Sequence, residues 1–186
     1  MTNMLHLYKT VLDEIGNSLD KLTAASYDAT VSEIAKAKRI ALYGVGREGL
    51  QIRGFAMRLF HLGLNCAVVG DMTTPAIGNG DLLIVSAGPG DFSTVSALIN
   101  VAQTAGARVL VVTANPEGAA ARHADSVLFL PAQTMANDEG EKRSALPMGS
   151  LYEAGLFVVF ELLILSLSDK LNVASSTMRS NHTNLE

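Results

Sequence analysis

The sequence predicts an α/β fold, a three-layer sandwich in which helices cover both faces of a five-stranded parallel sheet. Five short and almost continuously apolar runs are typical of strands that are buried on both faces. Helical stretches separate most of these runs, as parallel strands require. The 186-residue chain is long enough for one domain with a proper core, so residues 1–186 are expected to form a single domain.

The chain is expected to begin with helices. Apolar residues recur at helical spacing from Met4 to Leu22, which predicts a long amphipathic helix, and a shorter helix is expected from about Asp28 to Lys36. These N-terminal helices (4–36) precede the sheet and its loops (39–147), and a long C-terminal helix (148–171) with a tail ends the chain.

The predicted strands are Arg39–Val45, Asn65–Val69, Asp81–Ser86, Arg108–Thr113 and Ser126–Leu130. The helices that follow are expected at about Glu48–Leu62, Asp91–Ala105, Glu117–His123 and Met148–Leu171. A loop, without a helix, joins the second strand to the third. Such a doubly wound, flavodoxin-like sheet binds ligands beyond the carboxyl ends of its strands, so the loops at 44–49, 86–91 and 113–118 are the candidate binding loops.

Composition and charge exclude several classes of function. With a net charge of −4, the chain offers no Lys/Arg stripe for nucleic acid. The first residues show no signal-peptide pattern. The apolar stretch Ala154–Leu167 is too short for a bilayer and contains Glu161, so it is interpreted as a buried helix and no membrane partner is expected. A lone cysteine, Cys66, suits a reducing cytoplasm, and a hydrophobic fraction of 48% indicates apolar surface hidden between subunits.

The first Gly-rich turn, at 44–49, reads Gly-Val-Gly-Arg-Glu-Gly and matches G-x-G-x-x-G between a strand and a helix. Asp71, 22 residues beyond Gly49, is placed where the ribose-binding acid of an NAD-binding Rossmann oxidoreductase would lie. Any tight strand–helix turn also favours glycine. The pattern alone therefore leaves both a dinucleotide site and a purely structural turn open.

A second Gly-rich turn, at 86–91, reads Ser-Ala-Gly-Pro-Gly-Asp and again leads from a strand into a helix. Two such turns on successive core strands suit a small anionic or polyhydroxylated ligand held between two helix N-termini.

Several motifs in order resemble the SIS (sugar isomerase) domain family, and most of all its 6-phospho-3-hexuloisomerases. The similar segments are the first turn, Phe55–Gly63, Thr73–Ile77, Gly80–Ile84, Leu146–Glu153, Met178-Arg179 and His182–Glu186. The resemblance covers nearly the whole chain. It implies a SIS-type sandwich, assembled as a homodimer or homotetramer, that interconverts 3-hexulose 6-phosphate and fructose 6-phosphate through an enediol without a metal or organic cofactor.

The resemblance also implies roles for particular residues. It makes Glu153 the base and makes His182 a proton shuttle that reaches the site of a neighbouring subunit. Substrate would bind to the two turns, at Gly44, Gly46, Arg47, Glu48, Ser86, Gly88, Gly90 and Asp91. Without the resemblance, Glu153 would be interpreted as an acid that favours the helix dipole, and His182 as an exposed histidine on a frayed terminus.

The sequence departs from the family pattern at both turns. Glu48 replaces the serine of the usual Gly-x-Gly-Arg-Ser-Gly, and Gly88 and Asp91 replace the second serine and the threonine of the usual Ser-Gly-Ser-Gly-Glu-Thr. A like-charge contact at about 4 Å costs roughly 4 kcal/mol at an effective dielectric near 20. We therefore expect an altered phosphate pocket, unless the two carboxylates cap helices. A non-catalytic SIS protein that binds a sugar metabolite is the alternative function.

Overall fold

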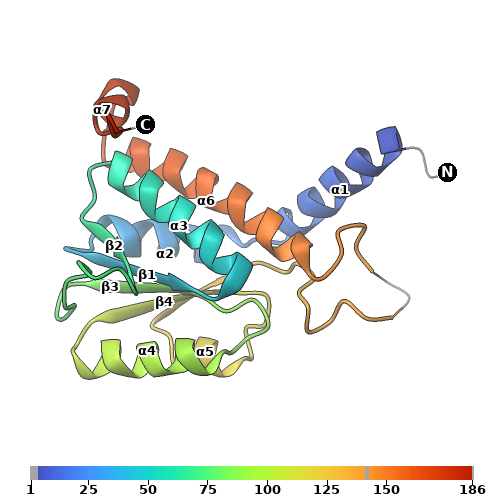
Figure 1. Ribbon diagram of the computed structural model, residues 1–186, viewed down its shortest axis with the longest axis horizontal. Coiled ribbons are helices and arrows are strands. Elements are labelled where there is room, and N and C mark those ends of the chain that lie inside the picture. The colour runs from blue at the N-terminus through green and yellow to red at the C-terminus, as the bar shows by residue number, and fades with distance from the viewer. Residues whose placement is uncertain (1–3, 141–142, 186) are drawn as a thin grey trace.

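The computed structural model describes residues 4–140 and 143–185 (Figure 1). Its strands are β1 (Ile40–Gly44), β2 (Cys66–Val68), β3 (Leu82–Ser86), β4 (Arg108–Thr113) and β5 (Ser126–Phe129). They form one parallel sheet in the order β2-β1-β3-β4-β5. This is the flavodoxin-like order, and it confirms the predicted fold class.

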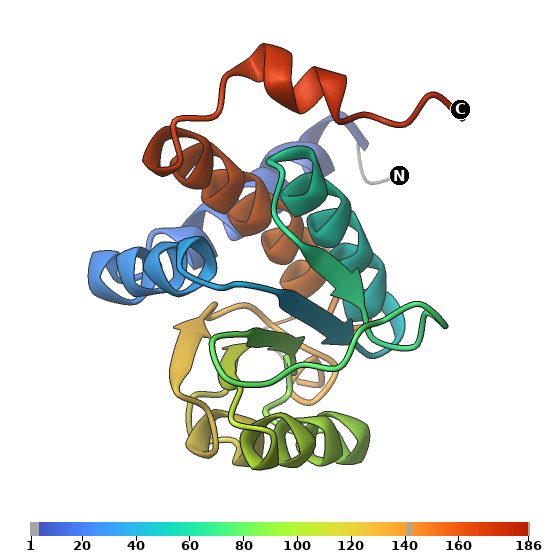
Figure 2. The same ribbon diagram turned by 90° about the vertical axis from the view of Figure 1, so that its left-hand side faces the viewer.

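Helices cover both faces of the sheet (Figures 1 and 2). One layer holds α1 (Met4–Leu19), α2 (Ala24–Ala35), α3 (Gly46–His61) and α6 (Ser150–Lys170). The other layer holds α4 (Ser93–Thr104) and the short α5 (Ala119–Arg122). A further short helix, α7 (Ser175–Ser180), follows α6 and was not predicted from the sequence.

The core lies on both sides of the sheet because alternate strand residues face opposite layers. Leu42 and Ile84 pack with α3 and α6, whereas Ala41, Leu83 and Val85 pack with α4. All five of these side chains are at most 3% exposed. The nearly continuous apolar strands of the sequence are thus explained by burial on both faces.

Several helix boundaries differ from the predicted ones by a few residues, and two of the helix starts have a clear local cause. The second helix begins at Ala24 and not near Asp28, because Thr23 precedes it as a cap and its Oγ1 accepts a hydrogen bond from Ser26 N at 3.3 Å. The long C-terminal helix begins at Ser150 and not at Met148. Met148 and Gly149 have φ angles of +56° and +70°, which no right-handed helix accommodates.

Helix α6 is long and apolar enough to cross a membrane by length and composition, with a mean hydropathy of 1.8. It instead packs into the domain, where Leu156, Leu163 and Leu167 are at most 1% exposed. The interpretation of this stretch as a core helix is confirmed, but the reason given for it was wrong: the helix extends beyond 154–167 to Ser150–Lys170, so its length does not exclude a membrane span. Its outward side keeps three large apolar side chains at the surface, Phe157, Leu162 and Leu165.

Candidate functional site

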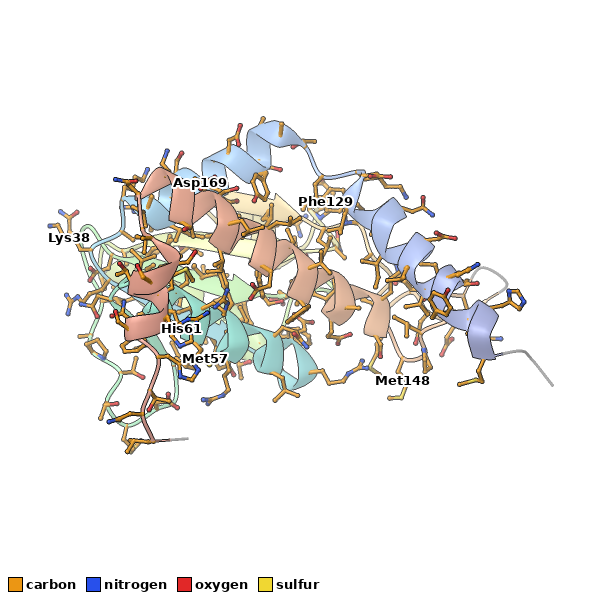
Figure 3. The ribbon with its side chains drawn as sticks, turned by 90° about the horizontal axis from the view of Figure 1, so that it is seen from above. Lys38, Met57, His61, Phe129, Met148 and Asp169 are labelled. Atoms are coloured by element: carbon orange, nitrogen blue, oxygen red, sulfur yellow. The ribbon has the colours of Figure 1, made fainter. Side chains whose placement is uncertain are left out.

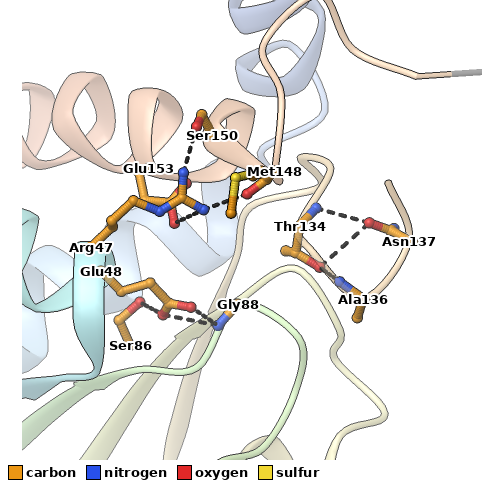
Figure 4. A network of polar contacts seen from close by, with 10 residues as sticks. All are labelled: Arg47, Glu48, Ser86, Gly88, Thr134, Ala136, Asn137, Met148, Ser150 and Glu153. Carbon is orange, nitrogen blue, oxygen red and sulfur yellow. Dashed lines mark hydrogen bonds and ion pairs between the residues drawn. The ribbon is translucent and has the colours of Figure 1, made fainter. Parts of the chain in front are cut away.

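A cavity of about 430 Å³ lies where α3 and α6 begin, beyond the carboxyl ends of β1 and β3 (Figure 4). Its lining combines apolar side chains with two carboxylates and one arginine. The lining residues are Val45, Gly46, Arg47, Glu48, Pro89, Phe92, Thr134, Met135, Gly149, Tyr152 and Glu153. This position is the one at which doubly wound sheets bind ligands.

The glycines of the first turn have a packing role. A Cβ on Gly49 would lie 2.5 Å from the carbonyl oxygen of Gly44, so the helix can approach the strand this closely only with glycine there. Gly46 has a left-handed φ of +55° and begins α3. The G-x-G-x-x-G pattern is therefore accounted for by backbone geometry. Asp71, the candidate ribose ligand, lies on the surface, where its Oδ1 is 3.3 Å from Arg53 Nη1.

Glu48 points from the first turn of α3 onto the second Gly-rich turn. Its carboxylate accepts hydrogen bonds from Ser86 Oγ at 2.5 Å and from Gly88 N at 3.0 Å, and only 6% of the residue is exposed (Figure 4). Burial raises the pKa of Glu48, and the hydrogen bonds from Ser86 and Gly88 oppose that rise. Glu48 thus joins the two turns and does not cap its helix, while it also lines the cavity.

Asp91 is placed differently from Glu48. It is exposed, it accepts a hydrogen bond from Ser96 Oγ at 2.5 Å, and it does not line the cavity. It does not cap α4 either, because the N-cap residue is Phe92, which makes no side-chain cap bond. Of the substrate-binding residues predicted from the sequence, Gly46, Arg47 and Glu48 line the cavity. Gly44, Ser86, Gly88, Gly90 and Asp91 lie outside its lining.

Tyr152 is a site residue that the sequence reasoning missed. It is 1% exposed, and its hydroxyl lies 3.3 Å from Ser86 Oγ. Burial raises the pKa of Tyr152 well above the usual value for a tyrosine. A Cβ on Gly88 would lie 2.7 Å from the Tyr152 ring and 2.9 Å from Glu48 Oε1. A side chain at position 88 would therefore force the Tyr152 ring or the Glu48 carboxylate to shift.

Glu153 lies in the first turn of α6 and lines the cavity. Its Oε1 is 3.3 Å from Arg47 Nη2. Its Oε2 is buried and has no hydrogen-bond partner in the described part of the chain. Burial raises the pKa of Glu153 above the usual value for a glutamate, and the positive charge of Arg47 partly opposes this rise. A carboxylate with one uncommitted oxygen beside a cavity is suited to accept a proton.

Arg47 fixes the start of α6 against α3. Its guanidinium donates to Ser150 Oγ at 2.6 Å and to the carbonyl oxygen of Met148, in addition to its ion pair with Glu153 (Figure 4). The carbonyl that it binds belongs to the left-handed residue before α6. Arg47 therefore orients the carboxylate and the backbone turn that carries it.

His182 lies at the other end of the α3–α6 pair. Its ring is 5.1 Å from that of His61, the last residue of α3, whereas Glu153 lies at the N-terminal end of α6. Figure 3 shows His61 and Met148 at opposite ends of these helices. Leu165 lines the cavity beside His182. Along α6 it lies about 18 Å from Glu153, because each helical residue adds 1.5 Å. Within one chain, the structure does not bring the two predicted catalytic residues together.

Two further predicted features are placed outside the cavity. The loop at 73–76 is held at the end of β2, where Thr74 Oγ1 donates to the carbonyl oxygen of Val68 at 2.7 Å. Cys66 is partly buried, and burial raises the pKa of its thiol to about 11. Residues 4–140 and 143–185 contain no group of three or more His, Cys, Asp or Glu side chains placed to hold a metal ion.

Comparisons with known proteins agree with this architecture. A protein of Mycobacterium gastri named 3-hexulose-6-phosphate isomerase is 40% identical over 100% of this chain and 92% of its own length. A protein of Bacillus subtilis with the same name is 33% identical over 95% of each chain. A solved structure from Methanococcus jannaschii, from which a function of 3-hexulose-6-phosphate isomerase was inferred, has a TM-score of 0.81 at 31% identity and covers 94% of this chain and 98% of its own.

A family model also matches the chain directly. The model of the SIS domain covers residues 33–154, which include both Gly-rich turns and extend to Glu153. The match extends over more than half of the sequence. The chain therefore belongs to the SIS domain family.

Proposed function

We propose that this protein is an isomerase that interconverts a 3-hexulose 6-phosphate and fructose 6-phosphate through an enediol. The observation that carries the proposal is Glu153, whose unpartnered Oε2 lies at a cavity beyond the carboxyl ends of the strands. Full-length relatives named 3-hexulose-6-phosphate isomerase support the same reaction. The direct test is to supply 3-hexulose 6-phosphate to the purified protein and to follow fructose 6-phosphate by NMR. No conversion would contradict the proposal.

The chemistry needs a proton to move between neighbouring carbons. Glu153 would remove the proton from C2 of the 3-ketose, and the electron pair would form the 2,3-enediol as the C3 carbonyl oxygen takes a proton from His182 of another copy and becomes a hydroxyl. The protonated Glu153 would return the carbon proton to C3, while O2 gives its proton back to His182 and becomes the new carbonyl. Arg47 holds one oxygen of Glu153, so the other faces the substrate. Apolar lining residues such as Val45, Pro89 and Phe92 would exclude water.

A change of pH tests the pairing of Arg47 with Glu153. The base must be ionised, so kcat/KM falls when the pH drops below its pKa. The pKa of Glu153 is raised by burial, and the positive charge of Arg47 limits that rise. In Arg47→Gln, that pKa should rise, and the acid limb of the pH–rate profile should move to higher pH. Arg53→Gln removes an exposed arginine that pairs with Asp71, and it should leave the limb in place. An unmoved limb in Arg47→Gln would contradict the pairing.

The pocket is proposed to bind a phosphate ester less strongly than the serine-bearing family pattern would. The Ser86 hydroxyl and the Gly88 amide, two donors of the second turn, both bind Glu48 and are not available to a ligand. The buried carboxylate also repels a phosphate dianion. A ligand end with neutral hydroxyls or an amine suits such an acceptor better. This arrangement is the observation that favours the second candidate, a SIS protein that binds a sugar metabolite without turning it over.

Removing this carboxylate should strengthen phosphate binding. In Glu48→Ser, both donors of the second turn become available, so the affinity for fructose 6-phosphate is expected to rise in calorimetric titrations. Asp91→Thr is the matched control, because Asp91 is exposed and lies outside the cavity lining. The affinity of this variant for fructose 6-phosphate should equal that of the unmodified protein. If the unmodified protein binds fructose 6-phosphate tightly and Glu48→Ser does not improve binding, the carboxylate does not oppose the phosphate.

The active site is proposed to be completed by a second copy of the chain. Within one chain, His182 and Glu153 lie at opposite ends of the α3–α6 pair (Figure 3). Large apolar side chains remain exposed on these helices between the two ends, among them Leu50, Met57, Phe157 and Leu165. Two copies that pack this face together in opposite directions would each offer His182 to the cavity of the other.

We propose that the assembly is a homodimer or a homotetramer of a single SIS domain. We also propose a cytoplasmic location, without nucleic acid or membrane as a partner. Light scattering at micromolar concentration should give a mass at least twice that of the chain. A monomer would contradict the shared site.

A further inference from the structure

The segment that carries His182 is anchored to the end of α3. Asn181 Nδ2 donates a hydrogen bond of 3.0 Å to the carbonyl oxygen of His61. This carbonyl belongs to the last turn of α3, where the backbone leaves acceptors without partners inside the helix. The side chain of Asn181 thus binds the C-terminal end of α3, and α7 is joined to that helix through the residue next to His182.

The two histidine rings make a second contact. Their centroids are 5.1 Å apart and their planes differ by 29°. His61 is only 6% exposed, whereas His182 is exposed. The His182 backbone amide donates to the carbonyl oxygen of Arg179 at 3.2 Å, which keeps the turn after α7 closed. One face of the His182 ring therefore rests on a buried ring.

We propose that His61 and Asn181 form a clamp that positions His182, so that His61 is a positioning residue for the reaction. The inference rests on the proposed function, in which His182 of one copy serves the cavity of another. A histidine on an unanchored terminus would sample many orientations. Restricting it to the one orientation that transfers the proton would cost conformational entropy in the transition state. The clamp restricts the orientation of the His182 ring before the reaction begins, and it fixes the ring to α3 of its own chain.

His61 could be interpreted as a core histidine whose only task is packing. The contacts argue for more, because its carbonyl receives Asn181 and its ring receives His182, two neighbouring residues of the same tail. Both rings line one cavity of about 530 Å³ with Arg58 and Arg179. The His182 ring also lies 3.0 Å, at Nδ1, from the carbonyl oxygen of Thr183, and in the proposed assembly this ring reaches a substrate held by another copy.

The test compares kinetics in four variants of the full-length protein. His61→Ala should lower kcat by the same factor as His182→Ala and leave KM unchanged. The double variant His61→Ala with His182→Ala should lose no more than either single variant, because both changes act through one ring. His61→Phe keeps a flat ring under His182 and should retain most of the activity. Additive losses in the double variant, or no rescue by phenylalanine, would overturn the clamp.

Two controls keep the test decisive. If His61→Ala does not fold, Asn181→Asp replaces it, since aspartate has a similar size but cannot donate to the His61 carbonyl. The second readout is the NMR signal of the His182 ring, identified by its loss in His182→Ala. That signal should shift in His61→Ala or Asn181→Asp, and an unmoved signal would overturn the clamp. If His182→Ala keeps full activity, the shuttle role fails, and the NMR signal alone decides the clamp.

Discussion

Glu153→Gln is expected to keep the fold and to lower turnover by about 10²- to 10⁴-fold, the usual contribution of a positioned general base. Glutamine has nearly the same size, and its amide oxygen can still accept from Arg47, so the start of α6 should stay in place. It cannot take up the proton that leaves C2 of the substrate. The measurement is the rate of fructose 6-phosphate formation, together with the thermal midpoint of unfolding.

Glu33→Gln provides a matched control for this substitution. Glu33 is a half-buried glutamate on α2 that pairs with Lys36 and Arg108, and its pKa is lowered, in contrast to that of Glu153. The same chemical change there should leave turnover close to that of the unmodified protein. Near-normal turnover in Glu153→Gln would show that another group removes the proton. A loss of activity with an equal loss of stability would show that Glu153 is structural.

Gly49→Ala is expected to destabilise the protein and to abolish most of its activity. The new Cβ would lie 2.5 Å from the carbonyl oxygen of Gly44, a backbone atom that can move only if α3 moves away from β1. Overpacking of this kind typically costs about 1–3 kcal/mol. The thermal midpoint should fall by about 2–4 °C for each kcal/mol lost in a chain of this size. The same displacement would carry Arg47 and Glu48 out of place.

Gly16→Ala is the opposite case in another helix. Gly16 lies within α1, and a Cβ there would meet nothing within 4 Å. Alanine is favoured over glycine by about 0.5–1 kcal/mol inside a helix, so this variant should be slightly more stable. Thermal unfolding of the two variants side by side checks both predictions. A Gly49→Ala protein as stable as the unmodified one would mean that the strand–helix contact has room to relax.

Much of the fold could be predicted from the sequence, because its signals are local. The buried strands are continuous apolar runs, and the helices between them have clear amphipathic spacing. The short helix α7 was missed because its sequence, SSTMRS, contains a single large apolar residue and so has no periodicity to detect. The start of α6 was placed two residues early because nothing in the sequence indicates that Met148 adopts a left-handed backbone.

The candidate site was predictable only in part. Glu153 and Arg47 were assigned through motifs of the resembling family, and the structure places them in contact at the cavity. Tyr152 was missed because a tyrosine in an apolar helix is usually a core residue, and its polar contact appears only when Ser86 is brought opposite. The direction of Glu48 was left open since it depends on the space that Gly88 provides across the fold.

That dependence restricts the order in which such a pocket can arise by single substitutions. A serine Cβ at position 88 would lie 2.7 Å from the Tyr152 ring and 2.9 Å from Glu48 Oε1, so a chain that still had the family serine there would gain Glu48 only if these side chains shifted. Loss of the serine to Gly88 leaves room for the Glu48 carboxylate, which then accepts a hydrogen bond from the backbone amide of residue 88. From the serine-bearing pattern, the favoured route is therefore glycine first and glutamate second. The return route is restricted too, because a serine at position 88 regains its space only when both Glu48 and the Tyr152 ring move or are replaced.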